Sequence, residues 1–280
     1  MKYSLLIFLA LVFSNVFVWN QIVSAGPSKN LNMYLLDVGQ GDSQLLVLPA
    51  GPKILIDGGP EKAILKSLPK VLSPIDRYID LIILSHPQLD HFSGLISVIE
   101  RYQVGAFIYN GREGITPAWK DLLAVLKKRN VRVIVLGEGS TLTYEESKID
   151  FISPNKDFLK SKELNDTAFV ELFQSEGVRA MFTGDIGLNV EQELLKKYNL
   201  DIDILKVAHH GSKYSTGNEF LAAATPRVSV IQVGKNKYGH PTKEALGRLA
   251  QSGSAVYRND QDGTVRLKIK NGVINVSKEK

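Results

Sequence analysis

The sequence predicts an α/β fold in which two mixed β-sheets pack face to face and helices cover the outside. Many short apolar runs are separated by turns rich in Gly, Pro and Asn, which is typical of strands. Segments with the periodicity of amphipathic helices lie between these runs. One parallel sheet with its crossover helices does not accommodate so many short strands, whereas an αββα sandwich does.

The first three predicted strands form an antiparallel meander, because they are separated only by Gly-Gln-Gly and Ala-Gly-Pro turns. The run 81–85 is apolar throughout, as expected for a strand buried on both faces. Helices are predicted where apolar residues recur at helical spacing, and one of them has Pro117 at its start. The predicted strands are 32–37, 43–48, 53–57, 81–85, 106–109, 132–136, 167–174, 179–183, 202–208, 228–233, 255–258 and 265–269. The predicted helices are 95–102, 117–129, 189–198 and 243–250.

Residues 1–25 have the character of a signal peptide or an N-terminal anchor. Lys2 precedes an uninterrupted apolar run at 5–13, and the Val-Ser-Ala sequence at 23–25 has the small-x-small pattern of a cleavage site. A helix that spans a bilayer needs about 20 mostly apolar residues, and this segment reaches that length only by including polar side chains. Cleavage is therefore favoured over an uncleaved anchor. We expect an exported protein with a linker at 26–30 and a single domain at 31–280.

Composition limits the chemistry of this domain. The chain has no cysteine, so we expect no disulfide-linked partner and only His, Asp, Asn and Gln as metal ligands. The formal charge is +5, and the segment 204–268 alone holds ten Lys or Arg against four Asp or Glu. Such a run is either a solvated basic face or a surface for an anionic partner such as nucleic acid.

All five histidines lie in three short motifs that also carry other metal- or phosphate-binding groups. The motifs are Ser-His-Pro-Gln-Leu-Asp-His, Val-Ala-His-His-Gly-Ser and Tyr-Gly-His-Pro, and the first two follow predicted strands. Imidazole and carboxylate are common metal ligands, so the motifs predict a metal site assembled from distant loops. Their candidate residues are His86, Asp90 and His91, then His209 and His210, and finally His240.

Six segments, two of which contain the second and third histidine motifs, follow one another along the chain. They are Leu-Asp-Val-Gly-Gln-Gly-Asp-Ser at 36–43, Ile-Asp-Gly-Gly at 56–59, Thr-Gly-Asp at 183–185, Leu-Lys-Val-Ala-His-His-Gly-Ser at 205–212, Asn-Lys-Tyr-Gly-His-Pro at 236–241 and Val-Tyr-Arg-Asn-Asp at 256–260. Together with the first histidine motif they resemble the metallo-β-lactamase superfamily, and within it the extracellular hydrolase domain of ComEC competence proteins. The resemblance covers residues 31 to about 270 and implies the αββα fold of metallo-β-lactamases.

The resemblance also implies a metal site with roles for individual residues. Its ligands would be His86 at one position, Asp90 and His91 at a second, Asp185 bridging both, and His209 or His210 from a later loop. In such sites two metals about 3.5–4 Å apart activate water and hold the attacking and leaving oxygens. Asp57, and with it Asp42, would orient the ligands from behind, although an Asx turn is the alternative for Asp57.

The chain departs from the superfamily pattern at two positions. Gln88 stands where the signature has its second histidine, and an amide oxygen is a poorer, neutral donor. The His86 position is therefore expected to hold metal more weakly or to accept a water instead. No histidine comes from the middle of the chain, where Asn165 either contacts metal or substrate or caps a turn. We expect one or two divalent ions, with manganese, magnesium or iron suiting the site about as well as zinc.

Substrate contacts are expected beside these ligands. Ser212 offers a donor for a phosphate oxygen, and His240 fits either a general acid, a phosphate contact or a structural role beneath its proline turn. Lys213, Lys235 and Lys237 are expected to flank His240 at the rim of the cleft. All the motif loops should open at one edge of the sandwich, so that the ligands converge in one cleft.

These observations predict an exported, metal-dependent phosphodiesterase or nuclease that acts on DNA and is linked to competence or DNA uptake. Asp90, Asp185 and His240 would be its catalytic residues. One alternative is a DNA-binding surface protein with a decayed metal site, and another is a hydrolase of lactams, lactones or thioesters. The multi-span channel segment of ComEC proteins is not part of this sequence, so a role in uptake calls for a separate membrane partner.

Overall fold

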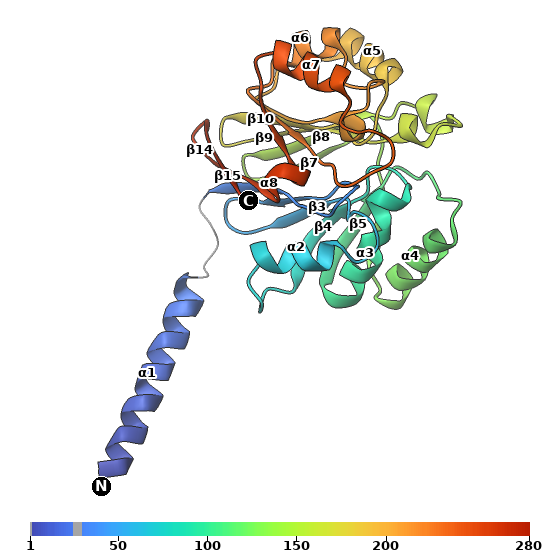
Figure 1. Cartoon of the computed structure of the whole chain (residues 1–280). Coiled ribbons are helices and arrows are strands. Elements are labelled where there is room, and N and C mark those ends of the chain that lie inside the picture. Colours follow the sequence, from blue (N-terminus) through green and yellow to red (C-terminus); the bar gives the residue numbers. More distant parts are fainter. Residues whose placement is uncertain (1, 25–29) are drawn as a thin grey trace.

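The computed structural model describes residues 2–24 and 30–280. Two sheets pack face to face in the domain, and helices cover the outer face of each sheet (Figure 1). The predicted αββα architecture is therefore confirmed.

The order of the strands within each sheet shows how the chain is wound. The first sheet has the order β15 (Val273–Lys278), β14 (Val265–Lys270), β1 (Leu31–Leu35), β2 (Gln44–Val47), β3 (Lys53–Ile56), β4 (Tyr78–Ile83), β5 (Gln103–Tyr109) and β6 (Arg132–Val135). The second has the order β13 (Ala255–Arg258), β12 (Val228–Ile231), β11 (Ile204–Lys206), β10 (Val178–Phe182), β9 (Val170–Ser175), β8 (Ser147–Ser153) and β7 (Thr141–Tyr144).

The helices are divided between the two outer faces. The first sheet is covered by α2 (Ile64–Val71), α3 (Leu89–Arg101) and α4 (Pro117–Lys128), and the second by α5 (Leu188–Lys197), α6 (Asn218–Ala224) and α7 (Lys243–Gln251) (Figure 1). The short helical segments are α8 (Asn259–Asp262) and the 3-10 turns η1 (Phe158–Lys160), η2 (Leu164–Thr167) and η3 (Ala208–Gly211).

Three apolar cores hold these layers together. Successive side chains of a strand point to opposite faces, so Leu45 and Ile82 pack under α2–α4 while their neighbours Leu46 and Ile83 pack between the sheets. The third core includes Phe220 and lies under α5–α7. Strands buried on both faces explain the continuous apolar runs in the sequence.

Both sheets combine antiparallel and parallel pairing. Strands β1, β2 and β3 form the predicted antiparallel meander, whereas β3–β6 and β10–β13 are parallel. Ligands of such folds bind beyond the carboxyl ends of parallel strands. The loops after β4, β10, β11 and β12, which carry the histidine motifs and Asp185, all leave from such ends.

The sequence prediction omits β7, β8, β15, α2, α6 and α8. Strands β7 and β15 are largely exposed edge strands, so they lack the apolar runs on which the prediction rests. Helix α2 contains Pro69, and α6 and α8 are short. Helix α3 begins at Leu89 rather than at residue 95, which changes the setting of the first histidine motif.

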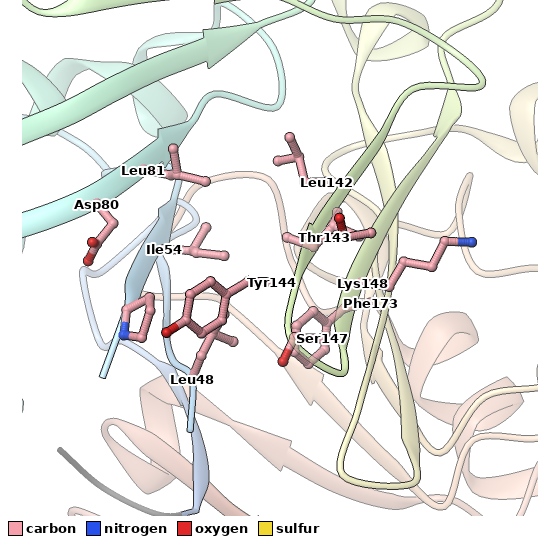
Figure 2. A pocket seen from close by; sticks show the side chains of 12 residues that line it. Leu48, Ile54, Asp80, Leu81, Leu142, Thr143, Tyr144, Ser147, Lys148 and Phe173 are labelled. Atoms are coloured by element: carbon pink, nitrogen blue, oxygen red, sulfur yellow. The ribbon is translucent and has the colours of Figure 1, made fainter. Parts of the chain in front are cut away.

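An apolar cavity of about 230 Å³ lies between hairpin β7–β8 and strands β3 and β4 (Figure 2). Leu48, Ile54, Leu81, Leu142 and Phe173 supply most of its apolar lining. None of the predicted site residues lines this cavity, so the chemistry of the motifs lies elsewhere in the fold.

At the N-terminus, α1 (Lys2–Ser24) is a continuous helix, and its side chains from residue 3 to residue 19 are exposed. Within residues 2–24 and 30–280, no helix is long and apolar enough to cross a membrane. The predicted cleavage point after Ala25, and the linker 26–30 apart from its last residue, lie outside the described residues.

Glycines allow helix α3 to approach the end of β3 closely. A Cβ atom on Gly94 would lie 2.1 Å from the carbonyl oxygen of Gly58. The Gly94 amide donates to the carbonyl of Gly59 (2.9 Å), and the Gly58 amide donates to the carbonyl of His91 (2.6 Å). This backbone contact sets the position of His91 relative to the β3 end.

We therefore predict opposite effects for two glycine-to-alanine substitutions in helices. Gly94→Ala should lower the free energy of unfolding by about 1–3 kcal/mol, because the new methyl group overlaps backbone atoms. Gly247→Ala in α7, where no atom lies within 4 Å of the added Cβ, should raise it by up to about 1 kcal/mol through helix propensity. Urea unfolding followed by circular dichroism measures both, and equal effects would contradict the packing argument.

Candidate metal centre

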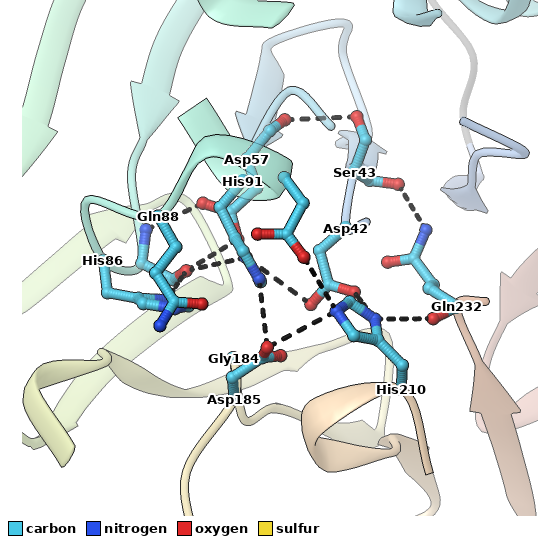
Figure 3. A network of polar contacts seen from close by, with 12 residues as sticks. Asp42, Ser43, Asp57, His86, Gln88, His91, Gly184, Asp185, His210 and Gln232 are labelled. Carbon is cyan, nitrogen blue, oxygen red and sulfur yellow. Dashed lines mark hydrogen bonds and ion pairs between the residues drawn. The ribbon is translucent and has the colours of Figure 1, made fainter. Parts of the chain in front are cut away.

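Four side chains from three distant segments converge at the edge of the sandwich where the parallel strands end. Their potential ligand atoms all lie within 4.8 Å of one another, and Figure 3 shows three of them facing a common point. They are Asp90 and His91 from α3, Asp185 from the loop after β10, and His210 from η3 after β11. The structure thus brings together residues that are more than one hundred positions apart.

Asp90 and His91 lie in the first turn of α3, ahead of residue 95 where the predicted helix begins. Gln88 precedes the helix in an extended conformation. His91 is fully buried, whereas the Asp90 side chain keeps 33% exposure and lines the open side of the cluster. The first turn of one helix therefore supplies both groups: His91 to the buried part of the cluster and Asp90 to its open side.

The adjacent histidines of the second motif have separate positions. Both have left-handed backbone angles, with φ of 48° and 53°, and their ring planes are 76° apart. His210 Nδ1 donates to the carbonyl of Gln232 (2.8 Å), which leaves Nε2 facing Asp185 Oδ2 (3.4 Å) and Asp90 Oδ2 (3.3 Å). His209 Nε2 lies 4.0 Å from Asp185. Of the two, His210 is thus the one placed to bind metal.

A carboxylate orients His91 from behind. The Nδ1 atom of His91 lies 2.8 Å from Asp57 Oδ2, and Ser85 donates to the same carboxylate from its amide (2.8 Å) and hydroxyl (2.6 Å). With Nδ1 engaged in this way, Nε2 of His91 faces Asp185 Oδ2 at 3.3 Å. This is the carboxylate–histidine arrangement that fixes the tautomer of metal ligands.

Lys206 is a site residue that the sequence reasoning missed. It is fully buried, its ammonium donates to the carbonyl of Gly184 (2.7 Å) and contacts Asp42, and it lies 3.6 Å from Asp185 Oδ1. Burial lowers the pKa of Lys206, but Asp42 and Asp185 outweigh this and raise it, so the group stays charged. The available signal was a lysine inside the apolar strand run 202–208.

The His86 position is poorer in ligands. His86 is buried, its Nδ1 lies 3.0 Å from the Ser85 hydroxyl, and its Nε2 has no hydrogen-bond partner among the described residues. Burial and His91 lower the pKa of His86 to about 3, so the ring is in the neutral form that binds metal. The Gln88 amide donates to Asn165 Oδ1 in η2, and the Asn165 amide lies 3.3 Å from His209 Nδ1.

The donor set fits a divalent metal ion. Buried polar atoms normally have hydrogen-bond partners, yet His86 Nε2, His91 Nε2 and Asp185 Oδ1 make none within the described part of the chain. Burial raises the pKa of Asp185, but His210 and His91 hold it well below its ordinary value. A charged carboxylate among imidazoles offers the oxygen and nitrogen donors that divalent transition metals prefer, and four such donor residues, Asp90, His91, Asp185 and His210, lie together in one cluster.

An open cleft of about 690 Å³ leads to this cluster. His240 lies on its wall, with its ring 5.4 Å from that of His209. Ser212 is buried and does not line the cleft, and its hydroxyl accepts the amide of Tyr214 (3.3 Å). Lys213, Lys235 and Lys237 are exposed and are not among the lining residues. The lining residues are Gln40, Pro60, Glu61, Gln88, Leu89, Asp90, Ser93, Ala118, Asn165, Asp185, His209, His210, Tyr238 and His240.

The sequence matches the family model of the beta-lactamase superfamily domain over residues 53–216, more than half of the chain. The chain belongs to this superfamily. It is 30% identical over 258 residues to ComE operon protein 3 of Bacillus subtilis (85% of this chain, 33% of the relative). It is 27% identical over 258 residues to competence protein ComA of Neisseria gonorrhoeae (89% and 34%). The chain thus spans about a third of the length of these curated relatives.

Solved structures agree with this assignment at the level of the fold. The metallo-β-lactamase-fold protein YhfI of Bacillus subtilis has a TM-score of 0.57 with 14% identity, and the match covers 89% of this chain and all of YhfI. The family relation and the observed donor set together give a superfamily hydrolase domain with a candidate metal site, related to competence proteins.

We predict that the two adjacent histidines differ in their effect on metal binding. His210→Ala should weaken metal binding by more than about tenfold, because the ring faces two carboxylates of the cluster. His209→Ala, its matched control, should leave the affinity of the cluster within about threefold. Calorimetric titration with Mn²⁺ and Zn²⁺, with metal content after dialysis, measures both. Equal losses would show that the ligand has been misassigned.

A buried carboxyl lies between the sheets beneath this centre. Glu171 on β9 pairs in register with Phe151 and Phe182, and neither of its carboxyl oxygens has a hydrogen-bond partner among the described residues. Burial, reinforced by the charge of Asp57, raises the pKa of Glu171 well above its ordinary value. The protonated form is therefore the one compatible with the folded protein.

Glu171→Gln is expected to change how stability depends on pH. Because the pKa of Glu171 is higher in the folded than in the unfolded protein, its protonation stabilises the fold. This contribution to the free energy of unfolding is complete below the unfolded-state pKa and is lost as the pH rises through the folded-state pKa. The glutamine variant does not lose this stability. Its free energy of unfolding, relative to that of the wild type, should therefore increase as the pH rises. Urea unfolding between pH 5 and pH 9 measures the difference, and a difference independent of pH would refute a protonated Glu171.

Proposed function

We propose that this protein is a metal-dependent phosphodiesterase that cleaves DNA. The observation that carries the proposal is the four-ligand cluster of Asp90, His91, Asp185 and His210 at the floor of an open cleft. Divalent metals in such sites activate water and stabilise the oxygens of a displacement at phosphorus. The residues of the chain hold the metal, orient one another and shape the space above it.

Individual residues have defined tasks under this proposal. Asp57 keeps the Nε2 lone pair of His91 directed into the site, and Gln232 does the same for His210. Burial and His209 lower the pKa of His240. In its neutral form His240 would hydrogen-bond a phosphate oxygen of the substrate at the cleft wall, and it would not act as a fixed positive charge.

Two observations favour a nucleic acid over a small substrate. The segment 204–268 carries a local excess of positive charge, which attracts polyanions at long range. The relatives include a protein named for competence, and competence concerns DNA. We therefore also propose that the domain works outside the cytoplasm, beside a separate membrane partner that conducts DNA.

Cleavage of a labelled DNA oligonucleotide with Mn²⁺, Mg²⁺ or Zn²⁺ tests this function. Asp185→Asn should lower the rate by roughly a hundredfold or more, because the carboxylate at the centre of the cluster is lost. Glu193→Gln, a change at a partly exposed position on α5, is the matched control and should leave the rate unchanged.

The two alternatives give distinct outcomes in the same experiment. DNA binding that survives Asp185→Asn, with no cleavage under any of the metals, would identify a DNA-capturing protein. The pairing of Gln88 with Asn165 is the observation that supports this reading. Turnover of lactones or thioesters without cleavage of DNA would identify a small-substrate hydrolase.

A further inference from the structure

Tyr238 is an exposed aromatic side chain at the rim of the metal cleft. It keeps 64% of its surface exposed although it lines the cleft. Its ring lies 5.9 Å from that of His240, with the planes 33° apart, and the ammonium of Lys237 lies 5.9 Å from the Tyr238 ring centroid. The Tyr238 ring therefore lies beside both the cleft and the ammonium of Lys237.

The loop that carries Tyr238 is held in place by its own hydrogen bonds. Asn236 Oδ1 accepts the amides of Tyr238 (3.0 Å) and His240 (3.1 Å), while its side-chain amide donates to the carbonyls of Gly234 and His240 (both 2.8 Å). A Cβ atom on Gly234 would lie 2.4 Å from the carbonyl carbon of Gly39, so the loop packs directly on the segment after β1. The loop therefore holds Tyr238 in an exposed position before any substrate binds.

The depth of the metal cluster limits which nucleic acid can reach it. His91 and Asp185 are no more than 1% exposed, so a phosphate must enter the cleft to approach them. In a duplex the bases are stacked inside the helix and are unavailable to a side chain at the rim. A single strand can lower one phosphate into the cleft while its unstacked base remains at the rim.

We propose that Tyr238 is a stacking platform for a nucleobase next to the scissile phosphate, and that it selects single-stranded nucleic acid. Base–aromatic stacking is tolerant of sequence because every base has a π-face. Lys237 then lies where a neighbouring phosphate would pass. Pro60, Leu89 and Ala118 give the same cleft an uncharged surface suited to a base. This inference rests on the proposed function and specifies the substrate as a nucleic acid with an unstacked base next to the scissile phosphate.

Tyr214 provides a matched control within the same chain. It is exposed to a similar extent (66%), and the ammonium of Lys213 lies 5.0 Å from its ring centroid. It does not line the cleft. The two lysine–tyrosine pairs therefore differ in position and not in chemistry.

The test compares oligonucleotides with and without bases. A short single-stranded DNA and a version built entirely of abasic sites are cleaved by the full-length protein and by Tyr238→Ala, Tyr238→Phe and Tyr214→Ala. Tyr238→Ala should lower kcat/KM on the normal strand by roughly 5- to 100-fold. On the abasic strand the change should stay within about twofold, since there is no base to stack. Tyr238→Phe and Tyr214→Ala should stay within about twofold on both strands.

Equal losses on the two strands, or no loss on either, would overturn the stacking role. Unchanged metal content in Tyr238→Ala separates stacking from damage to the metal centre. If the wild-type protein cleaves neither strand, the proposed function fails, and the dissociation constants of the same strands become the readout. A base-dependent loss of binding in Tyr238→Ala still supports the platform, and its absence refutes it.

Discussion

The site depends on the pairing of buried carboxylates with a buried lysine and buried imidazoles. Asp42, Asp57 and Asp185 are almost completely inaccessible to solvent, and the groups nearest to them are His91 and Lys206, together with His210. An isolated buried charge costs several kcal/mol, and removing one partner of a buried pair is strongly destabilising. The same contacts aim the imidazoles at one point. Electrostatic pairing therefore stabilises the fold here and also shapes the metal site, and substitutions at these positions will affect both.

Part of the positive charge of the segment 204–268 is used within the fold. Lys206 is buried in the site, and the Arg248 guanidinium donates to the carbonyls of Lys213, Ser215 and Thr216, which holds the turn after the second histidine motif. Within the described chain, none of the residues that line the cleft is Lys or Arg. A count of charges along the sequence cannot separate such structural cations from a binding surface. For an anionic substrate, attractive contacts in the cleft would therefore have to come from neutral polar side chains, from the histidines or from a bound metal ion.

The sequence was sufficient to predict the fold and most residues of the candidate site, but not the geometry of the site. Apolar runs and strand-then-motif order predicted the sandwich and the convergence of Asp90, His91 and Asp185. They did not distinguish His209 from His210, because that choice depends on two consecutive left-handed residues and on the carbonyl of Gln232. Lys206 was missed for a similar reason, since its role follows from burial between carboxylates and not from a motif.

The two expected metal positions offer unequal ligands for a reason visible in the hydrogen bonds. At the second position two carboxylates and two imidazoles face one another, whereas at the first His86 is accompanied by two amides that bond to each other. An amide is neutral, so binding a cation there gains less electrostatic energy. Asn165 is further engaged with His209, which links the first position to the wall of the cleft. A substitution at the weaker position that turned the Asn165 amide would therefore also reach His209, which lines the cleft beside His240.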